Sequence, residues 1–151
     1  MKISPLLAVL ALLLPLQSSN AAIALVPLED RVAKAETIVV GTVSLDKTED
    51  GWHHGQITVT RSIKGSVKAG EKIPARWKVP PVPPKDPGVP RLPDYTYRPQ
   101  LDKEAVIILN AKKEDEASHA LGWGCMEPME SEEKVKALVS AGGDAPAPTK
   151  G

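Results

Sequence analysis

The amino-acid sequence predicts a mainly β protein: a small, partly open barrel of five short strands, with a short helix before it and another after it. Several segments rich in β-branched residues alternate apolar and polar side chains, which is the two-residue period of a strand. Helical spacing of apolar residues occurs near the two ends of the domain. Because phenylalanine is absent, we expect a core of valine, isoleucine, leucine and alanine.

The first half of the domain contains the first helix and two strands. LEDRVAKAE (28–36) has apolar residues at helical spacing and predicts the N-terminal helix. TIVVGTVSL (37–45) follows as a strand, and its Gly41 indicates a sharp bend or a close approach of two backbones. In the next strand, QITVTRSIKG (56–65), Arg61 interrupts the apolar row and indicates a β-bulge.

The second half supplies three further strands and the last helix. EKIPARWKV (71–79) alternates again, but Pro74 has no N–H to donate, so this strand should lie at an edge or contain a bulge. AVIILN (105–110) is continuously apolar, as in a strand buried on both faces, and SHALGWG (118–124) is the fifth strand. Ser131 is a suitable N-cap for the final helix, and a pair of glycines ends it.

The chain divides into an export signal, one domain and a tail. Residues 1–22 contain one positive charge, a short apolar stretch and small residues, which is the pattern of a secretory signal peptide. We therefore expect an exported bacterial protein, periplasmic or secreted, with no transmembrane span in the mature chain. The domain should occupy residues 23–143, with a proline-rich loop insert at 80–99 and a disordered tail at 144–151.

Three segments carry a resemblance to a known family. AETIVVGTVS (35–44), TVTRSIKG (58–65) and AVIILN (105–110) resemble small exported bacterial domains with an OB-like barrel, similar to the netrin and tissue-inhibitor-of-metalloprotease module. The resemblance implies an OB-like fold over about residues 28–139. The chain lacks the cysteines that join such modules and the N-terminal cysteine that chelates zinc in the inhibitors. The resemblance therefore implies the fold and not the inhibitory mechanism.

The overall charge excludes some classes of partner. The chain has 19 basic and 19 acidic residues, so it offers no broad electrostatic field for nucleic acid or anionic lipid. The cations Lys72, Arg76 and Lys78 share one face of the third strand. We expect that face to be solvated, or to make a modest contact with an anion or a polysaccharide.

GWHHG (51–55) is the first candidate for chemistry. A zinc site needs at least three protein ligands, so His53 and His54 would need His119 or a nearby carboxylate. Adjacent residues of a strand point to opposite faces, which separates the two imidazoles. Asp50 and the following glycine form a good turn dipeptide. We therefore interpret the stretch as a solvated hairpin loop and expect no metal and no cofactor.

Cys125 is the only cysteine and has three possible roles. It could pack as a small buried hydrophobe, form a disulfide bond with a partner, or act as a nucleophile with His119 as its base. Six residues of extended strand would hold the thiol and the imidazole about 20 Å apart. This spacing favours the structural role.

The proline-rich insert is the best candidate for contact with a partner. Residues 80–99 carry eight prolines, so we expect an extended, largely polyproline II conformation. Such a segment either packs over the barrel or binds a partner at little ordering cost. Long loops without secondary structure are more often functional than merely connecting.

These observations favour a binding protein over an enzyme. We predict an exported non-enzymatic domain that binds a protein or envelope component through the barrel edge and the insert. The candidate binding residues are Pro84, Pro87, Pro90, Tyr95, Tyr97 and Trp52. Two alternatives stay open: an accessory structural protein without a ligand, and a metal-binding or hydrolytic protein. The residues that the latter would use are His53, His54, His119 and Cys125.

Overall fold

The computed structural model describes residues 26–82, 85, 88 and 96–142. The predicted signal peptide, the predicted tail and most of the proline-rich insert lie outside the described residues. Two α-helices, a 3₁₀ turn and six strands make up the described part. The helical elements are α1 (Leu28–Lys34), η1 (Met129–Ser131) and α2 (Glu132–Gly142). The strands are β1 (Thr37–Glu49), β2 (Trp52–Lys64), β3 (Lys72–Lys78), β4 (Glu104–Leu109), β5 (His119–Ala120) and β6 (Met126–Glu127).

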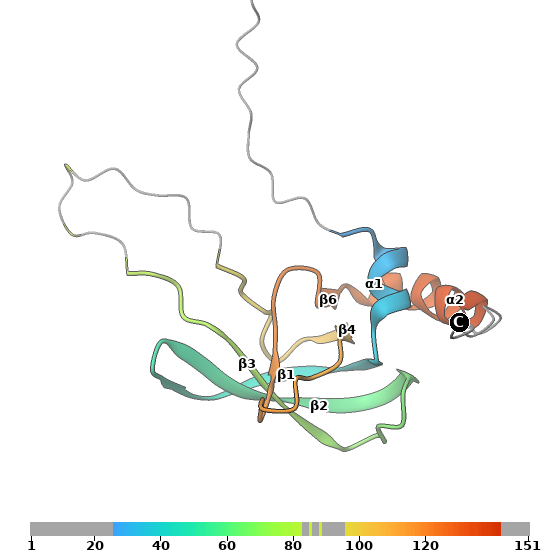
Figure 1. Cartoon of the computed structure of the whole chain (residues 1–151), viewed down its shortest axis with the longest axis horizontal. Helices are drawn as coiled ribbons and strands as arrows, with labels where there is room; N and C mark the ends of the chain where they lie inside the picture. The colour runs from blue at the N-terminus through green and yellow to red at the C-terminus, as the bar shows by residue number, and fades with distance from the viewer. Residues whose placement is uncertain (1–25, 83–84, 86–87, 89–95, 143–151) are drawn as a thin grey trace, which may run out of the picture.

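The strands form one curled sheet in the order β5-β3-β2-β1-β4-β6, which makes a half-barrel (Figure 1). All neighbours are antiparallel except β3 and β5. The mainly β class with two helices is confirmed. Strand β5 pairs only with Ala75 and Arg76, so Pro74 lies on a largely unpaired edge of β3, as predicted.

The prediction of five strands is wrong, because the segment expected as the fifth strand is broken. Only His119–Ala120 is a strand, and it lies beside β3. The chain then turns: the N–H of Cys125 donates to the carbonyl oxygen of Gly122 at 3.1 Å, and Gly124 has φ +83°. This turn carries the chain across to the opposite edge, where β6 pairs with β4. One predicted strand thus becomes two short strands at the two edges of the sheet.

The hairpin between β1 and β2 is tighter than the sequence indicates. Its turn consists of Asp50 and Gly51, with φ +50° and +74°, the conformation of a two-residue hairpin turn. Pairing continues to Glu49 opposite Trp52. The histidines of GWHHG therefore lie on strand β2 and not in the expected solvated loop. Only the turn at Asp50 and Gly51 is as predicted. Paired strands leave no room for a longer loop.

The predicted irregularities in the first two strands are confirmed. The register shifts between the pairs Val40–Arg61 and Gly41–Val59, which is the bulge expected beside Arg61. A Cβ atom built on Gly41 would overlap the backbone oxygen of Thr58. Glycine is therefore required at this position by a close approach of backbones.

Apolar side chains pack on both faces of the half-barrel. The interior core consists of Val39, Val43, Ile57, Val59, Ile73, Ala75, Trp77, Ile107, Leu109 and Leu121. The helix-side core consists of Val32, Ala35, Ile38, Val40, Val106, Ile108 and Val135. Strand β4 contributes to both cores, so its prediction as a strand buried on both faces is confirmed. The two helices lie together against one end of the sheet (Figure 1).

An ion pair attaches α2 to the sheet. The guanidinium of Arg61 donates from Nε and Nη2 to the two carboxylate oxygens of Glu132, at 2.8 and 2.5 Å. Lys136 contacts the same carboxylate at 2.9 Å. Ser131 directly precedes this helix, at the predicted start. These two cations lower the pKa of Glu132 from 4.5 to about 2.

We expect this pair to make the domain sensitive to acid. The folded pKa of Glu132 lies below its ordinary value, so its stabilisation is complete above pH 4.5 and is lost as the pH falls towards about 2. The urea midpoint of the Glu132→Gln variant should therefore lie below that of the wild type at pH 7. The two midpoints should converge near pH 2. An equal difference at both pH values would contradict this role of the pair.

Candidate functional site

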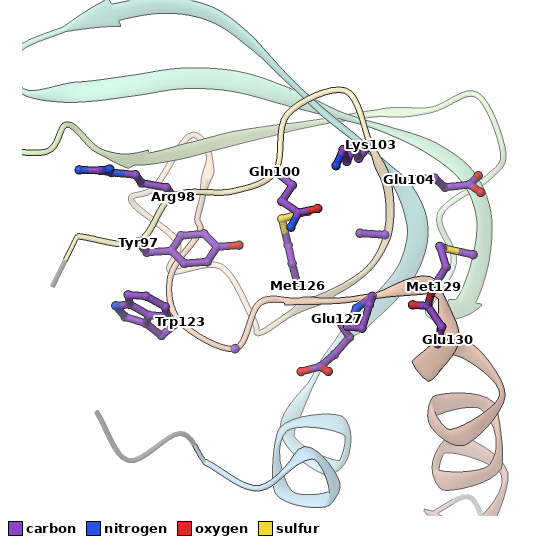
Figure 2. Close-up of a pocket in the computed structure, with 13 residues that line it drawn as sticks. Tyr97, Arg98, Gln100, Lys103, Glu104, Trp123, Met126, Glu127, Met129 and Glu130 are labelled. Atoms are coloured by element: carbon purple, nitrogen blue, oxygen red, sulfur yellow. The ribbon is translucent and has the colours of Figure 1, made fainter. Parts of the chain in front are cut away.

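The structure contains a cleft of about 640 Å³ at the end of the half-barrel where the proline-rich insert returns to the sheet (Figure 2). Three segments form its walls: the end of the insert with the residues that follow it, the start of β4, and the chain from the turn after β5 to η1. The side chains that Figure 2 labels around it are Tyr97, Arg98, Gln100, Lys103, Glu104, Trp123, Met126, Glu127, Met129 and Glu130.

Tyr97 lies half-buried in the wall and also packs against the interior core. Its hydroxyl oxygen is buried and has no hydrogen-bond partner among the residues that the structure describes. Figure 2 shows this hydroxyl pointing towards the middle of the cleft, on the side of Gln100 and Met126. Burial raises the pKa of Tyr97 well above its ordinary value, so the hydroxyl stays protonated. Buried tyrosine hydroxyls normally have a hydrogen-bond partner, so this unsatisfied one is unusual.

Trp123 lies at the same end of the cleft as Tyr97 (Figure 2). The two ring centroids are 5.7 Å apart and the rings meet edge to face at 70°. Trp123 is 51% exposed to solvent. A large exposed aromatic residue in a concave surface is typical of a site that binds another molecule.

Arg31 of α1 holds the wall that carries Trp123. Its Nη1 donates to the carbonyl oxygen of Gly124 and to Oε1 of Glu127, both at 2.6 Å, and its Nε donates to the carbonyl oxygen of Val26 at 2.9 Å. Only 16% of the Arg31 side chain is exposed. A Cβ atom on Gly124 would lie 2.9 Å from Cδ of Arg31, so glycine permits this close contact.

The structure separates the candidate metal ligands. His53 faces the interior, where its ring lies 5.6 Å from that of Trp77 and its Nδ1 is 2.7 Å from Oγ1 of Thr48. His54 is the next residue of the same strand and points to the other face. His119 lies on β5, and burial lowers its pKa. Within residues 26–82, 85, 88 and 96–142, no three His, Cys, Asp or Glu side chains come together as a metal site.

Cys125 packs against the interior core, as its structural interpretation predicts. Its Sγ accepts a hydrogen bond from the N–H of Gly122 at 3.4 Å. Burial raises the pKa of the Cys125 thiol. A raised pKa disfavours the thiolate, which is the reactive form, so the environment of this residue does not suit a nucleophile.

Trp52 lies outside the cleft. Its ring is stacked with two cations of β3: Nζ of Lys78 is 3.8 Å and Cζ of Arg76 is 4.8 Å from the ring centroid. Nη2 of Arg76 also contacts Glu116 at 3.0 Å. These contacts stabilise the outer face of the hairpin and belong to the cationic face that the sequence predicts.

Of the binding residues predicted from the sequence, the structure brings only Tyr97 into the cleft. Four others, Pro84, Pro87, Pro90 and Tyr95, lie outside the described residues. Sequence reasoning missed Trp123, because this tryptophan was interpreted as part of a strand. The two glycines that flank it are the signal that could have identified an exposed aromatic residue on a turn.

Comparison with models of known protein families gives no match, and neither does comparison with curated proteins. The OB-like, netrin-like resemblance therefore stays a prediction. Within the part of the chain that the structure describes, no helix is both long enough and apolar enough to cross a membrane. A function can therefore be inferred only from the geometry of the cleft.

Proposed function

We propose that this chain is an exported, non-enzymatic binding domain that holds a protein partner in the cleft beside Tyr97 and Trp123. The observation that carries the proposal is the aromatic pair itself: a half-buried tyrosine with an unpaired hydroxyl supports a tryptophan that is 51% exposed. We further propose that the half-barrel is OB-like, in line with the resemblance of its sequence. The insert enters the proposal because Tyr97 lies near its C-terminal end.

The chemistry of the cleft favours binding over catalysis. The pKa values of the Tyr97 hydroxyl and of the neighbouring Cys125 thiol are both raised by burial, so each stays protonated at neutral pH. Neither is suited to act as a nucleophile or as a base. Aromatic side chains and methionine instead supply adaptable contact area, which is what protein interfaces use.

We place the site at the β6 end of the sheet and not along β3. Strand β3 carries Pro74 and a row of cations, features that discourage another chain from pairing with an edge. Strand β6 is only two residues long and has a neighbour on one side alone. Its Met126 lies in the wall of the cleft.

Two single substitutions test the site. A tagged full chain expressed in its native compartment should retain a co-purifying partner protein as the wild type and lose it as Trp123→Ala. We expect a loss of at least about 2 kcal/mol of binding energy, roughly thirtyfold in affinity, because exposed tryptophans dominate interfaces. Quantitative mass spectrometry of the purified complexes measures this loss.

The matched control is Trp52→Ala, which removes the same side chain from the outer face of the hairpin. Circular dichroism should show that both variants keep the β fold. Loss of the partner in Trp52→Ala and not in Trp123→Ala would place binding on the hairpin and overturn the proposal. Retention of the partner by both variants would overturn it too.

A further inference from the structure

We infer that the partner enters the cleft as an extended polypeptide segment, with an apolar side chain at the Tyr97–Trp123 end and a lysine or arginine at the Glu130 end. This inference rests on the proposed function and adds the chemistry of the occupant. It follows from three features of the walls: the aromatic end, the unpaired hydroxyl with the free edge of β6, and the distribution of charge.

The aromatic end selects an apolar anchor. Tyr97 and Met126 both pack against the interior core, so their positions are set from beneath the cleft. Trp123, which is 51% exposed, lies at the same end of the cleft (Figure 2). An aromatic or large aliphatic side chain placed there would contact two rings and a thioether, and the flexible thioether adapts to different shapes.

The main chain of an extended segment would supply the missing hydrogen bonds. The buried hydroxyl of Tyr97 lacks an acceptor, and a peptide carbonyl oxygen is one. Within the described part of the chain, strand β6 is the terminal strand of the sheet and pairs with β4 alone. In an antiparallel pair the backbone groups of successive residues point alternately to the two sides. The carbonyl oxygen of Cys125 accepts a hydrogen bond from the N–H of Ile108 in β4. The N–H and carbonyl groups of the next residue, Met126, therefore point to the unpaired side of β6. A peptide can add to such an edge as a further strand.

The charges of the walls set the direction of the segment. Glu130 is exposed and makes no hydrogen bond or ion pair within the described part of the chain. It lies with Met129 and Glu104 at the end opposite the aromatic pair, while Arg98 lies at the aromatic end (Figure 2). Glu127 is already paired with Arg31. Glu104 interacts electrostatically with Arg61, so Glu130 is the carboxylate that remains for a basic residue of the partner.

A positional-scanning array of acetylated nonapeptides, probed with the full mature chain, tests the inference. We expect enrichment of Trp, Phe, Tyr, Leu or Met at one position and of Lys or Arg two to four positions away. Exchange of that basic residue for glutamate should weaken binding roughly fivefold, the size of one partly exposed charge pair. The Glu130→Lys variant should reverse the preference from basic to acidic. Glu114→Lys makes the same change of charge outside the cleft lining and should leave the preference unchanged.

The Tyr97→Phe variant separates a role of the hydroxyl in binding from a role in stability, because it allows both quantities to be measured. Because the hydroxyl has no partner in the free protein, its removal should leave the urea midpoint unchanged or raise it. Affinity for the selected peptides should nevertheless fall several-fold. A lowered midpoint with unchanged affinity would overturn the hydrogen-bond step.

The failures of the inference and of the proposed function can be told apart. If the array selects no peptide, or if Glu130→Lys leaves the charge preference unchanged, the inference on the occupant is wrong. The loss of the cellular partner in Trp123→Ala would still support a binding site at the cleft. If Trp123→Ala retains that partner, the proposed function fails irrespective of the array.

Discussion

Replacing Gly55 by alanine is expected to destabilise the domain by about 3 kcal/mol or more, at the upper end of the range for overpacked cores. Gly55 is the second glycine of GWHHG, and it is buried in β2 between β1 and β3. A Cβ atom at this position would overlap the backbone oxygen of Ser44 and would lie 3.0 Å from Cη2 of Trp77. Neither neighbour can move easily, since one belongs to a paired strand and the other to the interior core.

Urea unfolding followed by tryptophan fluorescence measures this loss. Small domains have only about 5–15 kcal/mol of stability in total, so the shift of the midpoint should be large. The control is Gly142→Ala, because a Cβ atom there would have nothing within 4 Å and the residue ends a helix. The control should be neutral or slightly stabilising. A wild-type midpoint in Gly55→Ala would mean that β1 and β2 do not approach so closely.

Replacing Arg31 by methionine is expected to cost about 2–3 kcal/mol and to loosen the cleft. The change keeps the apolar part of the side chain but leaves the carbonyl oxygen of Gly124 and the carboxylate of Glu127 without their donor. Hydrogen bonds to charged groups contribute about 1.5–3 kcal/mol, and removing one partner of a poorly exposed pair costs more than the pair adds. Hydrogen exchange should show faster exchange of the amides in residues 123–127.

An exposed ion pair between α1 and α2 provides the control. Nζ of Lys134 lies 3.3 Å from Glu29, and both side chains are mostly exposed. The Lys134→Met variant should change stability by less than about 0.5 kcal/mol and should leave exchange in residues 123–127 unchanged. Equal effects of the two substitutions would show that Arg31 does not hold the cleft wall. Because Arg31 acts through the position of Trp123, its loss should also weaken the binding of a partner.

Three of the four strands that were predicted correctly are consecutive along the chain and also adjacent in the sheet, while the fourth, β4, is recognisable as a continuous apolar run. Strands β1, β2 and β3 form a meander, and their alternation is visible over many residues. The segment over 118–124 was predicted wrongly because its two glycines permit a turn that alternation alone does not reveal. The same turn exposes Trp123, so the error in the strand and the missed site residue have one cause.

The candidate site was predictable only in part. Tyr97 was identified because an aromatic residue within a proline-rich segment is conspicuous in the sequence. Its pairing with Trp123 could not be predicted, because the two residues are 26 positions apart in the chain and no local pattern links them. The histidines of GWHHG were correctly expected to diverge, since opposite faces for adjacent strand residues are a local property.

By itself, the sequence determined the mainly β class, the two helices, the turn at Asp50 and the residues buried on both faces of β4. These features follow from side-chain periodicity and turn chemistry, which act over a few neighbouring residues. The tertiary structure alone decided the six-strand order, the cleft and the unpaired hydroxyl of Tyr97. Those features require contacts between distant segments, such as the bonds of Arg31 to Gly124 and Glu127, and such contacts exist only once the chain has folded.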